Sequence, residues 1–337
     1  MKRPAIGYGV VGMGFMGRVH VEALQRAAAD GFPVRLVAVA DPDPERRSGR
    51  FRAAGNVAAA TDESRLFDPA EVRGHASLED LLADEEVEAL SLCTRTETHV
   101  AFAIEALRAG KHVLVEKPVA LTSAAVESLL AEAERHPGLR VMPAMCMRFW
   151  PGWTELAEAL ADGRFGRPRS AVFRRVGPPP TWSRDFYGDL EKSGGALFDL
   201  HVHDVDFLRA VFGDPVALDT AGTALHLTTL YRFADPALHV TAEGGWGASP
   251  GFPFTMRYTV AFERATLDFD LARETPLFLY AEGEARPQTL VAGNGYDGEI
   301  RHFLNCIAEG LEPRVGLADS LAVTRLLERE ARALAGR

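Results

Sequence analysis

The chain has 337 residues, with 37 Lys and Arg against 47 Asp and Glu, so its formal net charge is −10 at pH 7. Hydrophobic residues make up 47% and charged residues 25% of the sequence, which is typical of a globular protein and excludes disordered and fibrous classes. At roughly 100–200 residues per domain, the length predicts two domains, each with a core of its own. The acidic balance and the absence of a long basic run argue against nucleic acid as a partner.

Cysteine usage and hydropathy both predict an intracellular protein. The sequence contains three widely spaced cysteines, Cys93, Cys146 and Cys306. They form no CxxC pair, so neither a disulfide framework nor a thiolate zinc site is expected, and a cytoplasmic location fits best. The apolar stretch after Lys2 and Arg3 imitates a signal peptide, but five glycines interrupt it before residue 18. No membrane segment is expected, because no run reaches about 18 uninterrupted apolar residues.

The first 145 residues alternate strand-like apolar runs with helix-like periodicity. Several runs are apolar throughout, as expected when both faces of a parallel sheet are covered. Five strands are predicted, at Pro4–Val11, Val34–Ala40, Val87–Cys93, His112–Glu116 and Leu139–Met145. Helical spacing follows over Thr96–Ala109, and Ser77 is expected to cap a short helix over Leu78–Ala83. The repeated βα order predicts an α/β domain with a doubly wound parallel sheet over residues 1–145.

From residue 146 the pattern changes to one typical of an α+β domain that extends to residue 337. Helices are predicted near Trp153–Leu160, from about Leu197 to Phe212, and twice at the end of the chain. The run Met256–Phe262 alternates apolar and polar residues, which indicates an antiparallel sheet with one covered face. Further strands are predicted at Ser170–Val176, Leu225–Phe233, Leu238–Trp246, Leu267–Asp270, Leu277–Tyr280 and Thr289–Val291. The second domain is therefore expected to contain a large open sheet.

A glycine-rich motif, Gly12-Met13-Gly14-Phe15-Met16-Gly17, follows the first predicted strand and opens a helix. In this context Gly12 allows a tight turn, Gly14 lets the backbone approach a pyrophosphate, and Gly17 lets the helix pack closely against the strand. The helix N-terminus offers unpaired N–H groups to the phosphates. The motif therefore predicts a dinucleotide site, although glycines that serve only a tight turn are the alternative.

Asp41 directly follows the second predicted strand, where a carboxylate can accept hydrogen bonds from a ribose diol. Its negative charge would repel a 2′-phosphate, and the adjacent Pro42 and Asp43 supply no cation to bind one. We therefore expect NAD as the cofactor, with NADP less favoured.

Lys117 lies in Glu116-Lys117-Pro118, at the carboxyl end of a predicted strand. Ligands of open α/β sheets bind beyond the carboxyl ends of strands, so this lysine is placed for function. Its ammonium group could donate to a substrate oxygen or stabilise alkoxide charge. The alternative is an ordinary surface lysine on a turn made by Pro118.

A dense polar cluster extends from Asp199 to Asp206. If this segment is helical, Asp199, His203 and Asp206 lie on one face and His201 lies nearly opposite. If it is a strand, His201 and His203 share a face and are interpreted as metal ligands. The helix is favoured because the apolar residues here repeat with helical spacing and Gly213 ends the run. A solvated helix start without a chemical role remains the alternative.

Together these motifs resemble those of the glucose–fructose oxidoreductase/inositol dehydrogenase/rhizopine-catabolism family, usually written Gfo/Idh/MocA, over nearly the whole chain. The resemblance rests on three segments: the glycine motif with His20, Ala109-Gly110-Lys111-His112 leading to Glu116-Lys117-Pro118, and Gly194-Gly195-Ala196-Leu197-Phe198-Asp199 followed by His203 and Asp206. It implies a Rossmann domain and a C-terminal domain that binds substrate and forms a homodimer or homotetramer through its open sheet. It also implies hydride transfer between NAD(P) and a sugar or polyol carbon.

The resemblance further implies which residues form the site. By position, Lys117, Asp199 and His203 match the family's catalytic lysine, aspartate and histidine, and the peptide before Pro118 is often cis in relatives. No metal is expected. The expected cofactor-binding residues are Gly12, Gly14, Phe15, Met16, Gly17, Asp41, Thr94, His99, Glu116 and Lys117. The expected substrate-binding residues are Lys117, Arg148, Trp182, Asp199 and His203, and further pocket candidates are Trp153, Asp185 and Tyr296.

Three features depart from the family pattern. The chain has Thr94-Arg95-Thr96 where relatives usually have Thr-Pro, which adds a cation near the expected cofactor. His201 stands where relatives commonly have glycine. The segment Ala53–Val72 is longer than the usual link between the second and third strands. The sequence leaves the roles of these three features open.

The leading hypothesis is oxidation of a secondary alcohol, or the reverse reaction. His203 takes the hydroxyl proton, Lys117 donates to the same oxygen, and Asp199 orients His203 or binds a neighbouring hydroxyl. One alternative is an NAD-dependent glycosidase with no net redox change. A second is a non-catalytic dinucleotide or sugar sensor, and a third is a metal-dependent hydrolase built on His201 and His203.

Overall fold

The computed structural model describes residues 4–50, 65–181 and 183–336. Contacts divide the chain into two units. The first comprises Met1–Cys146 and Tyr296–Ala322, and the second comprises Met147–Gly295 and Val323–Arg337. The sequence-based boundary after residue 145 stays a prediction, and the contacts assign the late segment Tyr296–Ala322 to the first unit.

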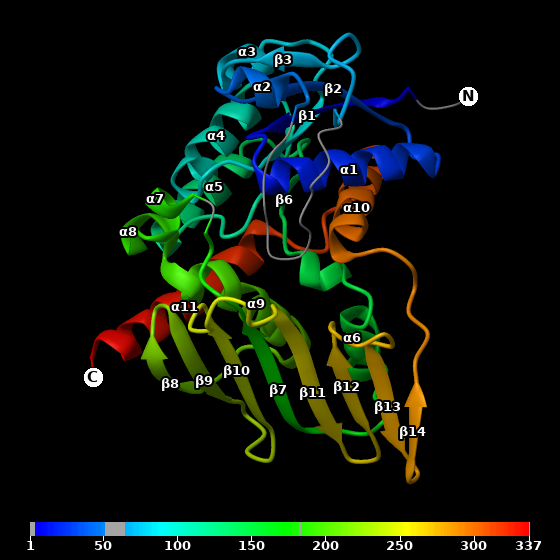
Figure 1. The fold of residues 1–337 in the computed structure, drawn as a ribbon, viewed down its shortest axis with the longest axis vertical. Coiled ribbons are helices and arrows are strands. Elements are labelled where there is room, and N and C mark those ends of the chain that lie inside the picture. The colour runs from blue at the N-terminus through cyan, green and yellow to red at the C-terminus, as the bar shows by residue number, and fades with distance from the viewer. Residues whose placement is uncertain (1–3, 51–64, 182, 337) are drawn as a thin grey trace. The chain divides into compact units, whose positions relative to one another are not determined.

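The first unit is built on a six-stranded parallel sheet with the strand order β3-β2-β1-β4-β5-β6 (Figure 1). The order reverses between β1 and β4, which is where doubly wound sheets bind their ligands. The predicted doubly wound sheet is confirmed. The sequence missed β3 because this strand has three residues and no apolar run. The strands are β1 (Ile6–Val11), β2 (Val34–Ala40), β3 (Arg73–His75), β4 (Ala89–Leu92), β5 (His112–Val115) and β6 (Val141–Pro143).

Helices of the first unit connect these strands and share their core. Val113 of β5, Leu107 of α4 and Leu129 of α5 are fully buried in one cluster. Burying such a side chain contributes roughly 1.5–3 kcal/mol. Ser77 accepts a hydrogen bond from the Asp80 N–H and so caps α3, as the sequence predicted. The helices are α1 (Phe15–Ala29), α2 (Pro44–Arg47), α3 (Leu78–Leu82), α4 (Thr96–Arg108), α5 (Ser123–Ala133) and α10 (Gly295–Glu309).

The second unit contains an eight-stranded sheet in which β7 and β10 are parallel and the other neighbours are antiparallel (Figure 1). Its order is β14-β13-β12-β11-β7-β10-β9-β8, so the predicted mainly antiparallel sheet is confirmed. The strands are β7 (Pro168–Val176), β8 (Ala217–Thr223), β9 (His226–Arg232), β10 (His239–Gly245), β11 (Thr255–Phe262), β12 (Thr266–Asp270), β13 (Leu277–Ala281) and β14 (Glu284–Pro287).

The prediction of a strand at Thr289–Val291 is wrong. The chain turns at Glu282 and Gly283, so the residues that pair with β13 are Glu284–Pro287. A polar edge strand of this kind carries no apolar alternation, which is why the sequence placed the strand a few residues too late.

The covered face of the second sheet packs around Trp153. This side chain is fully buried, and its ring lies 4.8 Å from that of Phe207 and 5.3 Å from that of Tyr258 between centroids. Trp153 begins α6 (Trp153–Asp162), and Phe207 lies in α9 (Val202–Phe212).

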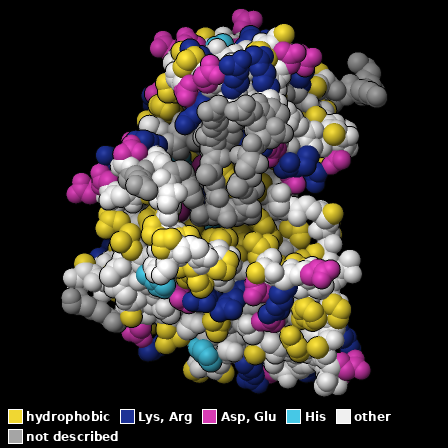
Figure 2. Space-filling model, in the orientation of Figure 1, with side chains coloured by type: hydrophobic (Ala, Val, Ile, Leu, Met, Phe, Trp, Pro, Cys, Tyr) yellow, Lys and Arg dark blue, Asp and Glu magenta, His cyan; other side chains and the backbone are white. Residues whose placement is uncertain are grey.

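Figure 2 shows side chains of both charge signs interspersed with apolar ones over the strands. The pairing of Arg174 with Glu243 at 2.6 Å is one such contact between neighbouring strands.

The predicted helix from Leu197 to Phe212 is confirmed, but its first turn, η2 (Leu197–His201), is a π-helix. Short helices precede it, and a long helix ends the chain. These elements are η1 (Cys146–Phe149), α7 (Arg184–Tyr187), α8 (Leu190–Ser193) and α11 (Leu317–Ala335). Among the described residues, no helix has the length and apolarity that crossing a membrane requires.

Candidate active site

The glycine motif forms a tight turn between β1 and α1. Gly12 has φ +86°, and a Cβ there would lie 2.7 Å from the Cys93 carbonyl oxygen. A Cβ on Gly17 would lie 2.1 Å from the Gly12 carbonyl oxygen. Gly14 differs, because no atom of the described residues lies within 4 Å of the Cβ position there. Gly12 and Gly17 therefore serve the turn itself, whereas a side chain at position 14 would meet none of the described residues.

The start of α1 fits the diphosphate of a dinucleotide. Gly14 is the N-cap residue and supplies no side-chain cap, and the first turn contains no acidic residue. The first N–H groups of a helix lack internal partners, and the helix dipole favours an anion there. Phe15 and Met16 begin the helix and are half-buried. The backbone at residues 14–16 could thus hold an anion.

Asp41 lies at the carboxyl end of β2 and is 5% exposed. Its Oδ2 accepts a hydrogen bond from the Met13 N–H at 2.8 Å, and its Oδ1 accepts one from the Asp43 N–H at 2.9 Å. The carboxylate therefore holds the glycine turn in place. Arg46 Nη1 lies 3.9 Å from Oδ2, because α2 folds back toward Asp41. The sequence analysis missed this cation, although Asp43 before Pro44 is a recognisable helix start.

Lys117 follows β5, and its backbone N–H donates to Glu116 Oε2 at 3.0 Å. The Lys117–Pro118 peptide is cis. His99 lies beneath this loop, 1% exposed, with Nδ1 2.9 Å from the Pro118 carbonyl oxygen and Nε2 3.1 Å from that of Thr94. Burial lowers the pKa of His99, so the ring is neutral at pH 7 and one N–H donates at a time. His99 therefore joins the loops after β4 and β5.

A buried polar cluster lies behind Glu116. His20 Nε2 lies 3.0 Å from Glu116 Oε1, and His20 Nδ1 lies 2.8 Å from Ser91 Oγ. Tyr8 extends the chain of hydrogen bonds, with its hydroxyl 2.9 Å from Ser91 Oγ. Glu299 Oε1 lies 3.9 Å from His20 Nε2. His20, Glu116 and Glu299 are close enough to consider as metal ligands, but the direct hydrogen bond between His20 and Glu116 favours a proton-sharing cluster.

Sequence analysis missed Glu299. The residue is fully buried on α10, and neither carboxyl oxygen has a hydrogen-bond partner among the described residues. Burial, and then the charge of Glu116, raises the pKa of Glu299 well above its usual range, which favours the neutral form of this carboxyl group. A signal was present, because Glu299 lies four residues before Phe303 on the apolar face of the helix.

In the second unit, η2 and α9 carry the other expected catalytic residues. Asp199 and His203 are both half-buried. Asp206 makes a two-pronged ion pair with Arg148, at 2.6 and 2.8 Å, so Arg148 is held by the same helix segment as the expected catalytic residues. Because the segment is helical, His201 and His203 do not share a strand face. The strand geometry on which the metal-hydrolase alternative rested is therefore wrong.

The structure groups the expected residues within units. The expected residues of the first unit are the glycine motif, Asp41, Thr94, Glu116 and Lys117, which follow the carboxyl ends of its strands, and His99 in the first turn of α4. Arg148, Asp199 and His203 belong to the second unit. Trp182 and residues 53–64 of the long link lie outside the described residues. Of the weaker pocket candidates, Trp153 is a core residue and Asp185 is exposed.

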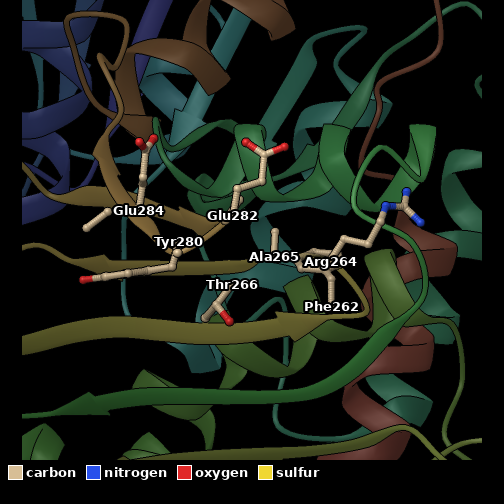
Figure 3. Close-up of a pocket in the computed structure, with 10 residues that line it drawn as sticks. Phe262, Arg264, Ala265, Thr266, Tyr280, Glu282 and Glu284 are labelled. Carbon is tan, nitrogen blue, oxygen red and sulfur yellow. The ribbon is translucent and has the colours of Figure 1, made fainter.

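A hollow in the second unit lies near the hairpin turns of β11–β12 and β13–β14 (Figure 3). Its lining residues include Arg264, Thr266, Tyr280, Glu282 and Glu284, and it contains none of the expected site residues. Arg286 pairs with both glutamates at 2.8 Å, which explains their placement without a ligand. We assign no function to this hollow.

Comparisons with known proteins show the family of this chain. Two family models match: "Oxidoreductase family, NAD-binding Rossmann fold" over residues 6–144, and "GFO/IDH/MocA C-terminal domain" over residues 153–268. Inositol 2-dehydrogenase 2 of Saccharopolyspora erythraea is 34% identical over 218 residues, which cover 64% of this chain and 56% of that protein. The chain thus spans little more than half the length of this relative.

Two further relatives match over more of their length. Myo-inositol 2-dehydrogenase of Thermotoga maritima is 26% identical over 332 residues, which cover 92% of this chain and 91% of that protein. The solved UDP-N-acetylglucosamine 3-dehydrogenase of Acidithiobacillus ferrooxidans has a TM-score of 0.77 at 24% identity and covers 99% of each chain. With both family models matching, the chain belongs to the Gfo/Idh/MocA family of NAD-binding oxidoreductases.

Proposed function

We propose that the protein is an NAD(P)-dependent dehydrogenase. It transfers a hydride between the nicotinamide and a secondary alcohol or ketone carbon of a sugar, polyol or related small molecule. The observation that carries this proposal is the uncapped N-terminus of α1 at residues 14–16, with Asp41 and Lys117 at the carboxyl ends of strands in the same sheet. The polyol and nucleotide-sugar dehydrogenases among the relatives support the substrate class.

We propose NAD as the preferred dinucleotide. The α1 N-terminus binds the diphosphate, and the Asp41 carboxylate accepts ribose hydroxyls and repels a 2′-phosphate. Arg46 works against this preference, because its half-exposed guanidinium lies beside the same carboxylate. When bound, the nicotinamide accepts or returns the hydride. Thr94 and His99 shape the loop after β4, with His99 acting from beneath it.

The proposed proton chemistry uses Lys117, Asp199 and His203. His203 takes the hydroxyl proton during oxidation, and Asp199 orients it or binds a neighbouring hydroxyl. The Lys117 ammonium stabilises the charge that develops on the reacting oxygen. Arg148 is proposed as a substrate-binding residue, with its guanidinium plane fixed by Asp206. Trp182 remains a prediction.

Two other functions share this site. An NAD-dependent glycosidase would oxidise and later reduce its sugar, so it would bind NAD without net turnover. A sensor would bind NAD or sugar without any chemistry. The presence of Lys117, Asp199 and His203 together favours a catalyst, because a sensor needs no proton carrier.

We also propose a cytoplasmic homodimer or homotetramer that forms through the open sheet. Val172, on the central strand β7, is 50% exposed, and we propose that it lies in this interface. Light scattering coupled to size exclusion would measure the assembly, and Val172→Glu should shift it toward monomer. A wild-type protein that is monomeric at micromolar concentration would contradict this proposal.

The test of the activity is nicotinamide absorbance during a screen of polyols and aldoses with NAD and, separately, NADP. Lys117→Ala and His203→Ala should each lower kcat by about 10²-fold or more. The matched controls, Lys192→Ala and His239→Ala, change exposed residues and should leave kcat unchanged. Turnover that survives both site variants would refute the assigned roles. Absence of binding to either dinucleotide by calorimetry would refute the function itself.

A further inference from the structure

The π-helical turn η2 needs a physical explanation. A π turn has poorer backbone hydrogen-bond geometry than an α turn, and it occurs mainly as a single insertion, often at functional sites. Here it covers Leu197–His201 and continues directly into α9. Asp199 lies within the wide turn, and His203 lies two residues after it. Contacts outside the helix must therefore stabilise this turn.

His201 makes such contacts from the inner side of the turn. Its Nε2 lies 3.0 Å from the Tyr231 hydroxyl and 3.1 Å from Glu330 Oε2. The Tyr231 hydroxyl in turn donates to Glu330 Oε1 at 2.5 Å. All three side chains are fully buried. Tyr231 comes from β9 and Glu330 from α11, so the cluster ties the wide turn to two other elements of the second unit.

The contacts within the cluster indicate which of its atoms carry hydrogens. Burial, and then the Glu330 charge, raises the pKa of Tyr231, so its hydroxyl keeps its proton and gives it to Glu330. Because this hydroxyl oxygen then accepts from His201, Nε2 of His201 carries the hydrogen that it donates to Tyr231. Nδ1 has no hydrogen-bond partner among the described residues, so the ring is held through Nε2.

The sheet beneath the turn is shaped for this imidazole. A Cβ on Gly244 would lie 2.8 Å from the Cβ of His201 and 2.9 Å from its Nδ1. The ring thus lies directly on the β10 backbone, at a position that only glycine permits. This pairing of His201 with Gly244 indicates that the buried histidine is an integral part of the turn and not a solvated neighbour of His203.

We infer that His201, Tyr231 and Glu330 are positioning residues that hold the π turn and thereby fix Asp199 and His203 for the reaction. The inference rests on the proposed function for its catalytic consequence. The turn itself is a structural claim that needs no substrate. The two ion pairs that follow on α9, Asp204 with Arg175 and Asp206 with Arg148, hold the next turns of the helix. His201 performs the corresponding role for the wide turn.

The test uses the full chain and compares Tyr231→Phe with Tyr258→Phe. Both changes remove one buried hydroxyl from the same sheet, and the Tyr258 hydroxyl donates to the Gly152 carbonyl, away from the cluster. Hydrogen exchange is measured on peptides that cover residues 196–206. We expect about tenfold faster exchange in Tyr231→Phe and unchanged exchange there in Tyr258→Phe.

Kinetics of the same variants give the catalytic readout. Tyr231→Phe should lower kcat about tenfold and leave the affinity for the dinucleotide within about twofold, because the anion site belongs to the first unit. His201→Gln keeps an N–H donor and should retain more kcat than His201→Leu, which fills the space without a donor. If His201 had only a structural role, the kcat values of the two variants would follow their loss of stability and would not depend on the N–H donor.

The outcomes separate the two claims. Unchanged exchange at 196–206 in both Tyr231→Phe and His201→Leu would overturn the inference, whatever the activity. Faster exchange in a protein that turns over no sugar or polyol would support the cluster and refute the proposed function. Faster exchange with unchanged kcat would overturn the positioning role.

Discussion

Glu116 Oε1 lies 3.0 Å from Nε2 of His20, and both side chains are buried. The other oxygen of Glu116 accepts the backbone N–H of Lys117. One carboxylate therefore connects a histidine on α1 to the loop that presents the expected catalytic lysine. This connection gives Glu116 a structural role in the Glu-Lys-Pro segment besides the cofactor contact expected from the sequence.

Removal of His20 should destabilise the protein. His20→Ala leaves the buried Glu116 carboxylate and the Ser91 hydroxyl without their shared partner. The expected cost is about 1–3 kcal/mol per unsatisfied group. Urea unfolding would measure it, with Val19→Ala on the same helix as a control for loss of helix side-chain volume. Equal stability of His20→Ala and the wild type would show that the cluster contributes nothing.

Glu299→Gln should change the pH dependence of stability. The pKa of Glu299 is raised in the folded protein, so above its ordinary value of 4.5 the unfolded chain binds fewer protons than the folded one. Stability of the wild type therefore falls as pH rises through this window toward the folded pKa. Glutamine does not titrate, so the free energy of unfolding of the variant should rise relative to that of the wild type by up to about 1.4 kcal/mol per pH unit.

Unfolding free energies at pH 5, 6, 7 and 8 would measure this difference. Glu97→Gln, on an exposed position of α4, provides the control for loss of a carboxylate. A difference between Glu299→Gln and the wild type that stays constant over this range would mean that Glu299 is ionised in the folded protein.

Substitution of two glycines should separate folding from dinucleotide binding. Gly14 has φ −77° and open space at its Cβ position, so Gly14→Ala should fold normally. The added methyl group occupies the approach to the α1 N-terminus, and NAD affinity should fall by about tenfold or more. Gly12→Ala should lower the melting temperature, because φ is +86° and the Cβ meets the Cys93 carbonyl. Unchanged NAD affinity of Gly14→Ala by calorimetry would refute the phosphate site.

Arg46→Ala should increase the preference for NAD. The guanidinium beside Asp41 is the cation that would offset repulsion of a 2′-phosphate, whereas ribose hydroxyls need only the carboxylate. We expect the dissociation constant for NADP to rise about threefold to tenfold and that for NAD to change by less than twofold. Arg50→Ala, on a more exposed arginine nearby, is the control. An equal change for both dinucleotides would refute this role of Arg46.

Local sequence patterns determined the doubly wound sheet and the elements that carry the site. The strand Val34–Ala40 was predicted with its observed bounds, because a run that is apolar apart from Arg35 is typical of the centre of a parallel sheet. The glycine motif and Asp41 were found because their chemistry is encoded over a few consecutive residues. The strand–glycine turn–helix order leaves little room for a side chain at Gly12 and Gly17.

Contacts between distant residues were decided by the tertiary structure. Glu299 joins His20 from 279 positions away, and Glu330 joins His201 from α11. Each glutamate lies on an apolar helix face. The sequence periodicity indicates that such a residue is buried, but it does not indicate which residue it contacts. The π turn was also beyond the sequence, because the hydrogen-bond geometry lost in a wide turn is offset by contacts with β9, β10 and α11. The sequence alone thus determines elements and short motifs, and long-range packing determines which buried charges meet.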